Sequence, residues 1–306
     1  MTNLSIIIPH HYGTIIHDCL KSISQVHCEK IVVTSSWIFW AENKHKDVKV
    51  LWTGWNNPAF KRNNAAKYSK GEYILFLDDD CLPSIECIEL LYQYLSTHND
   101  VGMVYACLSG GDNHAGAYLT ASGFLYEQPF NGDIANPKPY PILSGKSACG
   151  MVRRSVFEKV GGFNNDYVIY CEETDLSWRI WEAGYMVVML PQAVCNHISD
   201  RKPKEYYDTR KIAYHGTKNY ISMLLSHLPF RYWWILPIHL FLWVIIALGK
   251  LLQGQPDYAR HIIYGIGYNL KRWPKRSKSH VRYWHHIYKN PPLRYYVQRI
   301  REYFRQ

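Results

Sequence analysis

The feature that most constrains the fold is an alternation of short apolar runs with helix-like segments in the first 80 residues. Ile16, Leu20 and Ile23 recur at helical spacing, and Gly71 ends a second helix-like segment. Runs of Val, Ile and Leu that are typical of buried strands occupy residues 4–9, 30–36, 48–52 and 73–79. Strand, helix, strand, twice over, predicts an α/β fold with a mostly parallel sheet. In such sheets ligands bind at the carboxyl ends of the strands.

The pattern continues toward residue 200. Residues 85–96 form an amphipathic helix by spacing, with Ser84 as its N-cap. The segment 109–142 is rich in Gly, Asn and Pro, and we expect a long loop region with short strands. A helix that ends at Gly184 and a strand at 185–190 follow. We therefore expect one catalytic-type domain over residues 1–205.

Charge divides the chain into two parts. Residues 1–200 contain 15 Lys and Arg against 21 Asp and Glu, whereas residues 201–306 contain 20 against 4. A mildly acidic part suits metal and small-molecule chemistry, and a basic, aromatic part suits a polyanionic surface. The eight cysteines contain no C-x-x-C pair and no secretory leader precedes the first strand. We expect reduced, buried thiols in a cytosolic protein.

Residues 206–306 are predicted to be a helical, membrane-associating region. The 18 residues 232–249 carry no formal charge, which is near the short limit for a spanning helix. Because both flanks are basic, we favour an in-plane or re-entrant helix, with a buried core helix as the alternative. Residues 294–305 have the pattern of an interfacial amphipathic helix, and 271–286 add cations and rings. The apolar segment favours an anionic membrane surface and no nucleic acid.

Asp78, Asp79 and Asp80 follow the fourth apolar run directly. Carboxylates in such a place bind hard cations, so we expect Mg²⁺ or Mn²⁺ that also takes substrate phosphates. Capping of the next helix is an alternative that needs only one aspartate. A D-x-D phosphatase is another, although its nucleophile normally follows the first strand. On an extended chain Asp79 points away from its neighbours.

A second acidic group opens a later helix. Glu172, Glu173 and Asp175 lie there, with Arg179 one turn beyond Asp175. Acids in a first helical turn are common for structural reasons. Crowding by other carboxylates would raise a pKa as a general base requires, whereas Arg179 and the helix N-terminus would lower it. His197, after the last strand, is a candidate metal ligand, although a lone histidine is more often structural.

Four segments together resemble family 2 glycosyltransferases in order and approximate spacing: residues 4–23, 61–83, 144–163 and 170–197. They are most similar to the rhamnosyltransferase-like, non-processive members that build bacterial surface polysaccharides. The resemblance implies a GT-A fold, a cation bound through the D-x-D motif, and an inverting displacement at the anomeric carbon. One departure concerns the second strand, which ends in Thr34 and Ser35 where the family has a base-reading aspartate.

The resemblance also implies roles for individual residues. Glu173 occupies the place of the usual catalytic aspartate, and Glu172 is the alternative base. The metal ligands are Asp78, Asp80 and His197. The nucleotide-sugar side comprises Pro9, His10, Thr34, Arg62, Asn63, Asp78 and Asp79. The acceptor side comprises Gly145, Asp175 and Arg179.

The expected function is a metal-dependent inverting glycosyltransferase at the cytoplasmic face of the membrane. Its donor is a nucleotide-diphosphate sugar, and its acceptor is a glycan or a polyprenyl-linked glycan. A catalytically inactive GT-A domain that serves as an assembly subunit at the membrane is the alternative. The sequence leaves open the sugar, the nucleotide, the linkage and the oligomeric state.

Overall fold

The computed structural model describes residues 1–11, 13–37, 39, 47–132, 138–198, 208–272, 281, 284–292 and 295–296. The chain divides into two compact units. The first comprises Met1–Ala117, Glu127–Val168 and Glu172–Arg201, and the second comprises Tyr118–Tyr126, Ile169–Cys171 and Lys202–Gln306. The second unit therefore takes two short pieces from within the first two-thirds of the chain as well as the C-terminal region.

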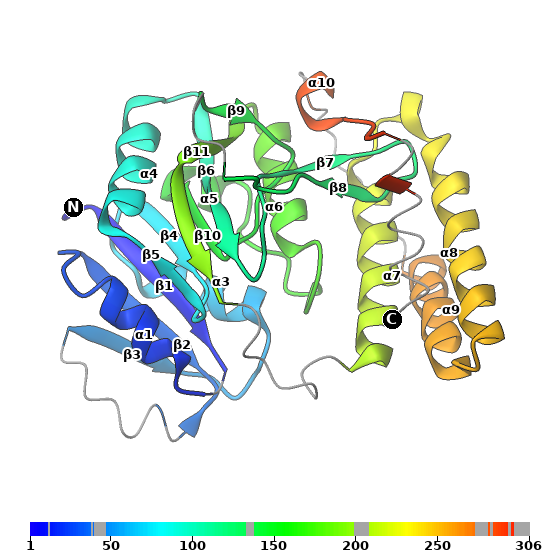
Figure 1. The fold of residues 1–306 in the computed structure, drawn as a ribbon, viewed down its shortest axis with the longest axis horizontal. Coiled ribbons are helices and arrows are strands. Elements are labelled where there is room, and N and C mark those ends of the chain that lie inside the picture. Colours follow the sequence, from blue (N-terminus) through cyan, green and yellow to red (C-terminus); the bar gives the residue numbers. More distant parts are fainter. Residues whose placement is uncertain are drawn as a thin grey trace. The chain divides into compact units, whose positions relative to one another are not determined.

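A nine-stranded sheet forms the centre of the first unit (Figure 1). Its order is β3-β2-β1-β4-β10-β6-β11-β5, and β9 pairs with β11. The strands are β1 (Leu4–His10), β2 (Glu29–Thr34), β3 (Val48–Trp52), β4 (Tyr73–Leu77), β5 (Cys81–Pro83), β6 (Val101–Gly110), β9 (Tyr140–Pro141), β10 (Cys149–Arg153) and β11 (Met186–His197). The first four run parallel, as predicted, whereas β10 is antiparallel to β4 and β6.

The order of the strands creates a switch point. From β1 the chain moves outward to β2 and β3, and then returns to place β4 on the other side of β1. In open α/β sheets a crevice forms outside the carboxyl ends of the strands at such a point. His10 ends β1, and the three aspartates follow β4. The topology therefore brings these residues to one crevice.

Burial on both faces explains why central strands such as β1 and β4 are almost wholly apolar. Ile6, Ile7 and Ile8 are all fully buried, although successive side chains point to opposite faces. Each buried aliphatic side chain contributes about 1.5–3 kcal/mol. The helices of this unit are α1 (Ile15–Ser22), α3 (Pro58–Tyr68), α4 (Ile85–Thr97), α5 (Arg154–Lys159) and α6 (Glu172–Glu182). The predicted cap is confirmed, because Ser84 accepts a hydrogen bond from Cys87 N at 3.0 Å.

The last strand is longer than the sequence analysis predicted. β11 extends to His197 instead of ending near residue 190. Its register against β6 shifts between Leu190 and Val194, so Pro191 lies at an irregularity and does not end the strand. This extension carries His197 into the sheet. The short strands expected within 109–142 are present as β7 (Ala117–Leu119), β8 (Leu125–Glu127) and β9.

The second unit is helical. Its long helices are α7 (Thr209–His227), α8 (Ile235–Leu252) and α9 (Pro256–Lys271), with a 3-10 turn at Phe230–Tyr232 and α10 (Trp284–Ile287). The long helices pack on one another (Figure 1). Gly265 permits the close approach of α9 to α7, because a Cβ there would lie 2.9 Å from the Thr217 Cβ. Most of the predicted helix at 294–305 and most of 271–286 lie outside the described residues.

Helix α8 has one buried face and one exposed apolar face. Among the described residues, α8 is the one helix that is, by length and composition, long and apolar enough to cross a membrane. On its buried face the His239 ring contacts Ser122 O at 3.0 Å and accepts from Trp243 Nε1 at 2.9 Å. The exposed side chains follow helical spacing: Ile238, Phe241, Val244, Ile245, Leu248, Leu251 and Leu252. We call these seven residues the α8 stripe.

Candidate functional site

The three aspartates form a turn, and each contacts a different partner. Cys81 N donates to Asp78 O at 3.1 Å, which closes the turn. Asp78 pairs with Arg62 at 2.6 Å. Asp79 pairs with His10 at 2.7 Å, and Asp80 lies 3.2 Å from His197. The structure thus brings Asp80 and His197 together and places Asp78 on Arg62. Facing separate cationic or imidazole groups offsets only part of the repulsion between these carboxylates, because burial and the neighbouring Asp80 and Asp78 still raise the pKa of Asp79.

Asp80 and His197 are positioned by strand pairing. In the antiparallel pairing of β5 with β11, Cys81 lies opposite His197, and Ile198 N donates to Asp80 O at 2.9 Å. Asp80 and His197 are 2% and 7% exposed. Together with Cys81 they are the group found among the described residues whose donor atoms lie within 4.8 Å of one another.

The donor set fits a hard cation. A carboxylate oxygen and an imidazole nitrogen suit Mn²⁺, and such ions complete their shell with water and phosphate oxygens. Burial raises the pKa of the Cys81 thiol well above its ordinary value, so the sulfur stays protonated and is a poor ligand for this class of ion. Asp80 and His197 are therefore the residues that would hold the metal.

His197 lies between two acids. Its Nδ1 is 3.5 Å from Asp112 Oδ2, a separation that describes an ion pair rather than a hydrogen bond. Burial alone would lower the pKa of His197, but Asp112 and Asp80 raise it to about 9. Lys146 pairs with Asp112 at 2.6 Å. The pKa of Asp112 lies below its ordinary value despite burial, because His197 and Lys146 stabilise the carboxylate.

The sequence analysis identified neither Asp112 nor Lys146. Lys146 belongs to one of the four family-like segments, between Gly145 and Ser147, which was the available signal. Asp112 lies in the Gly-rich region after β6, where spacing gives no indication of a spatial neighbour.

Arg62 connects the two acidic groups. Its side chain is buried, with Nη2 on Asp78 and Nη1 at 3.7 Å from Glu172 Oε1. The guanidinium also lies over the Phe163 ring at 5.4 Å. Because a buried charge needs compensation, Arg62 holds the end of β4 and the start of α6 in a fixed relation. The Arg62 guanidinium thus bridges the two acidic groups that the sequence analysis singled out.

The two glutamates differ in their electrostatic environment. Burial raises the pKa of Glu173 well above its ordinary value, and the neighbouring Glu172 carboxylate raises it further. Arg62 and Lys146 oppose this effect only in part. Burial also raises the pKa of Glu172, with Arg62 as the main opposing influence. Of the two glutamates, Glu173 thus has the pKa held further above its ordinary value.

The chain enters α6 through an unusual backbone. Tyr170 and Cys171 have φ values of 67° and 65°. These values lie in the left-handed region, which residues other than glycine rarely adopt. Each such residue costs about 1–3 kcal/mol, and they concentrate at functional sites. The strain lies immediately before the two glutamates.

On the nucleotide side, His10 has a ring nitrogen available. His10 is 1% exposed, and its Nε2 has no hydrogen-bond partner among the described residues. His10 Nδ1 and Asp79 Oδ2 form a hydrogen bond of 2.7 Å, and burial raises the pKa of Asp79. Pro9 pairs in the sheet with Val33. Thr34 is buried, and its hydroxyl accepts from Ser36 N at 2.9 Å.

The remaining predicted residues have structural contacts. Asn63 donates to Phe163 O at 2.7 Å and accepts from Phe163 N at 2.8 Å. Asp175 pairs with Arg179 at 2.6 Å, one helical turn apart. A Cβ at Gly145 would overlap the Tyr105 ring. These contacts support the local fold around the glutamates.

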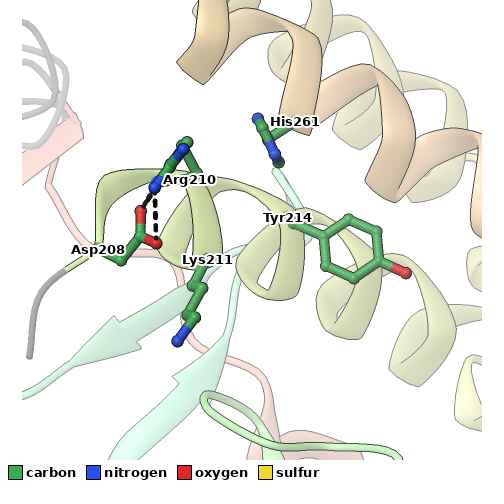
Figure 2. Close-up of a pocket in the computed structure, with 5 residues that line it drawn as sticks. All are labelled: Asp208, Arg210, Lys211, Tyr214 and His261. Carbon is green, nitrogen blue, oxygen red and sulfur yellow. Dashed lines mark hydrogen bonds and ion pairs between the residues drawn. The ribbon is translucent and has the colours of Figure 1, made fainter.

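A separate pocket lies in the second unit (Figure 2). It is lined by Asp208, Arg210, Lys211, Tyr214 and His261. Asp208 caps α7 by accepting from Arg210 N at 3.0 Å, and it also pairs with the Arg210 side chain. The positive charge of this pocket is thus partly neutralised. None of the aspartates and glutamates described above in the first unit lines this pocket.

The chain is similar in sequence to known glycosyltransferases. The model of the family described as "Glycosyl transferase family 2" matches residues 5–161, just over half of the chain. The N-acetylglucosaminyl-diphospho-decaprenol L-rhamnosyltransferase of Mycobacterium tuberculosis is 34% identical over 127 residues, 40% of this chain and 38% of that protein. The O-antigen chain rhamnosyltransferase WbaN of Salmonella anatum is 28% identical over 159 residues, 48% of this chain and 49% of that protein.

The chain thus covers less than half the length of either curated relative. Among solved structures, GalNAc-T7 with UDP, GalNAc and Mn²⁺ has a TM-score of 0.62 at 14% identity, covering 88% of this chain and 57% of that one. At this identity the likeness concerns the fold alone.

Proposed function

Because this chain belongs to glycosyl transferase family 2, we propose that it moves a sugar from a nucleotide-diphosphate donor to an acceptor hydroxyl. The observation that carries the proposal is the pairing of two acidic groups, Asp78–Asp80 and Glu172–Glu173, through buried Arg62. One group suits a cation and a diphosphate, and the other suits proton removal. An inactive assembly subunit would have no use for a carboxylate whose pKa is held high at such a place.

The donor would occupy the crevice at the carboxyl ends of β1 and β4. The buried His10 Nε2, which has no hydrogen-bond partner among the described residues, would be satisfied by a polar group of the nucleoside. A divalent cation on Asp80 and His197, when bound, would neutralise charge on the leaving nucleotide diphosphate. The crystallisation of GalNAc-T7 with UDP and Mn²⁺ supports Mn²⁺ or Mg²⁺ in this role.

Glu173 would act on the acceptor. Its carboxylate removes the proton from the attacking hydroxyl while that oxygen bonds to the anomeric carbon and the nucleotide diphosphate departs. A single displacement of this kind inverts the anomeric configuration. Glu172 is less suited to the role, because Arg62 pairs with its carboxylate and counteracts the rise of its pKa, which makes it a weaker base.

The acceptor would be a glycan or a polyprenyl-linked glycan at the cytoplasmic face of a membrane. The name of the M. tuberculosis relative specifies a diphospho-decaprenol acceptor. In this chain the α8 stripe offers an apolar surface, and residues 201–306 carry 20 Lys and Arg against 4 acids. Because His239 and Trp243 occupy the opposite face of α8, the helix suits an in-plane position on anionic lipid.

Substitution of the base tests the proposal. Glu173→Gln removes the proton acceptor but keeps the shape, so donor binding should persist while turnover falls by about 10²–10⁴-fold. Transfer and donor binding would be measured with full-length protein and Mn²⁺. Glu89→Gln, on the exposed face of α4, is the matched control and should behave as wild type. Normal transfer by Glu173→Gln would contradict the assignment.

A further inference from the structure

We propose that Asp112, held by Lys146, is the positioning residue that orients His197 as a metal ligand. The inference rests on the proposed function only in that the cation belongs to the same site. It concerns a carboxylate on the far side of the ring from Asp80, outside the group of potential ligands.

The geometry of the imidazole separates the two acids. Asp80 Oδ1 faces Nε2 at 3.2 Å, and Asp112 Oδ2 faces Nδ1 at 3.5 Å. A cation shared by Asp80 and His197 must therefore bind at Nε2, and the ring must keep its remaining proton on Nδ1. Asp112 Oδ2, 3.5 Å from Nδ1, is the carboxylate oxygen that faces that proton. Carboxylates that contact the outer nitrogen of a ligating histidine fix its tautomer and orientation and increase its basicity.

The backbone places Asp112 beside His197. β6 and β11 pair so that His197 lies opposite Gly110, and Gly111 N donates to His197 O at 3.0 Å. Gly110 adopts a φ of +96°, and a Cβ there would lie 2.5 Å from Asn196 Oδ1. Only glycine fits this turn without strain. The loop that carries Asp112 is thus anchored to the strand that carries His197.

Lys146 holds the Asp112 carboxylate in place. Its Nζ contacts the same oxygen, Oδ2, that faces His197. The side chains of Asp112 and Lys146 are 29% and 27% exposed, so the ion pair is partly buried. Asp112 Oδ2 contacts both the Lys146 ammonium and the Nδ1 side of the His197 ring. A direct metal ligand would instead present an oxygen to the Nε2 side of the ring. This arrangement distinguishes a positioning role from ligation.

A double-mutant cycle on Mn²⁺ binding tests the inference. Mn²⁺ alone is titrated into the full-length protein without donor, and the dissociation constant is measured by calorimetry. Asp112→Asn should weaken binding by about 10- to 100-fold in the wild-type background. It should have no further effect in His197→Ala, because a residue that acts through His197 loses its influence when His197 is absent.

The controls separate the alternatives. Asp47→Asn breaks the Lys30–Asp47 pair, in which Asp47 is 61% exposed, and should leave Mn²⁺ affinity unchanged. Lys146→Met provides a second variant if Asp112→Asn does not fold, and its loss of affinity should likewise vanish in His197→Ala. Equal losses in both backgrounds would overturn the positioning role, as would unchanged affinity in folded Asp112→Asn. A wild-type protein that binds no Mn²⁺ would instead contradict the metal site itself.

Discussion

Glu173 is a carboxylate that burial and a like charge keep from ionising easily. Its pKa in the folded protein lies well above the ordinary value of 4.5. Two consequences follow from this direction. In the proposed mechanism Glu173 acts only when deprotonated, so turnover should rise with pH through the raised pKa. The ionised group also opposes folding.

The second consequence gives a stability prediction for Glu173. The pKa of Glu173 is higher in the folded than in the unfolded protein. The protonated carboxyl therefore contributes its full share to the free energy of unfolding below the unfolded pKa, and this share is lost as pH rises through the folded pKa. Glu173→Gln does not titrate and should therefore be more stable than wild type at neutral pH. Urea unfolding at pH 5 and pH 8 checks this. A stability difference that does not widen toward the higher pH would contradict the account.

A second residue-scale prediction concerns His10. His10→Phe keeps a ring but removes both ring nitrogens, the unpartnered Nε2 and the Nδ1 that contacts Asp79, so the dissociation constant of the donor nucleotide should rise by at least about 3- to 10-fold, the range expected for one hydrogen bond. Thermal-shift titration with nucleoside diphosphates and Mn²⁺ provides the measurement. His27→Phe, at an exposed position, is the control. Unchanged affinity in His10→Phe would place the nucleotide elsewhere.

At the same scale, the sequence revealed which residue types matter but not where their side chains turn. Asp78, Asp79 and Asp80 were identified from spacing. Their divergence onto three partners depends on a turn that the strand-like pattern did not show. Asp112 was missed because its neighbour, His197, is far away along the chain and close only through the pairing of β6 with β11.

At the scale of elements, strands buried on both faces were predicted well. The runs that became β1 and β4 are almost wholly apolar and buried, which a covered parallel sheet requires, whereas the edge strand β3 includes exposed Lys49 and Trp52. β10 was not identified, because its residues Cys149–Arg153 lack a β-branched run and its antiparallel direction depends on its partners. The GT-A fold expected from the resemblance is confirmed by the fold likeness and the family match.

Helix α9 allows a matched test of packing between elements. Gly265→Ala would place a methyl group 2.9 Å from Thr217 Cβ and should destabilise the protein by about 1–3 kcal/mol. Gly267→Ala, in the same helix, meets nothing within 4 Å and should stabilise by roughly 0.5–1 kcal/mol through helix propensity. Thermal unfolding of both variants decides. Similar effects from both substitutions would contradict the packing of α9 on α7.

At the scale of the whole molecule, one sequence combines an acidic unit with a basic, helical one. The helical character of the C-terminal region was predicted from composition and apolar spacing. The inclusion of residues 118–126 and 169–171 in the second unit was not, because no linear boundary shows it. The membrane role of this region remains a prediction.

Vesicle flotation tests the membrane role. Phe241→Asp with Leu248→Asp places two charges on the α8 stripe and should release the protein from vesicles that contain anionic lipid. Gln25→Asp with Gln93→Asp adds the same charge to exposed positions of the first unit and should leave binding unchanged. Persistent flotation of the stripe variant would place the contact elsewhere.

In the proposed function, Asp80 and His197 hold a cation for sugar transfer from a nucleotide-diphosphate donor. The most direct measurement is release of nucleoside diphosphate from a panel of nucleotide sugars by the full-length protein, with and without EDTA. The account predicts release from at least one donor, its loss in EDTA and its recovery with added Mn²⁺. Release that persists unchanged in EDTA would contradict the metal site, and no release from any donor would contradict the transferase itself.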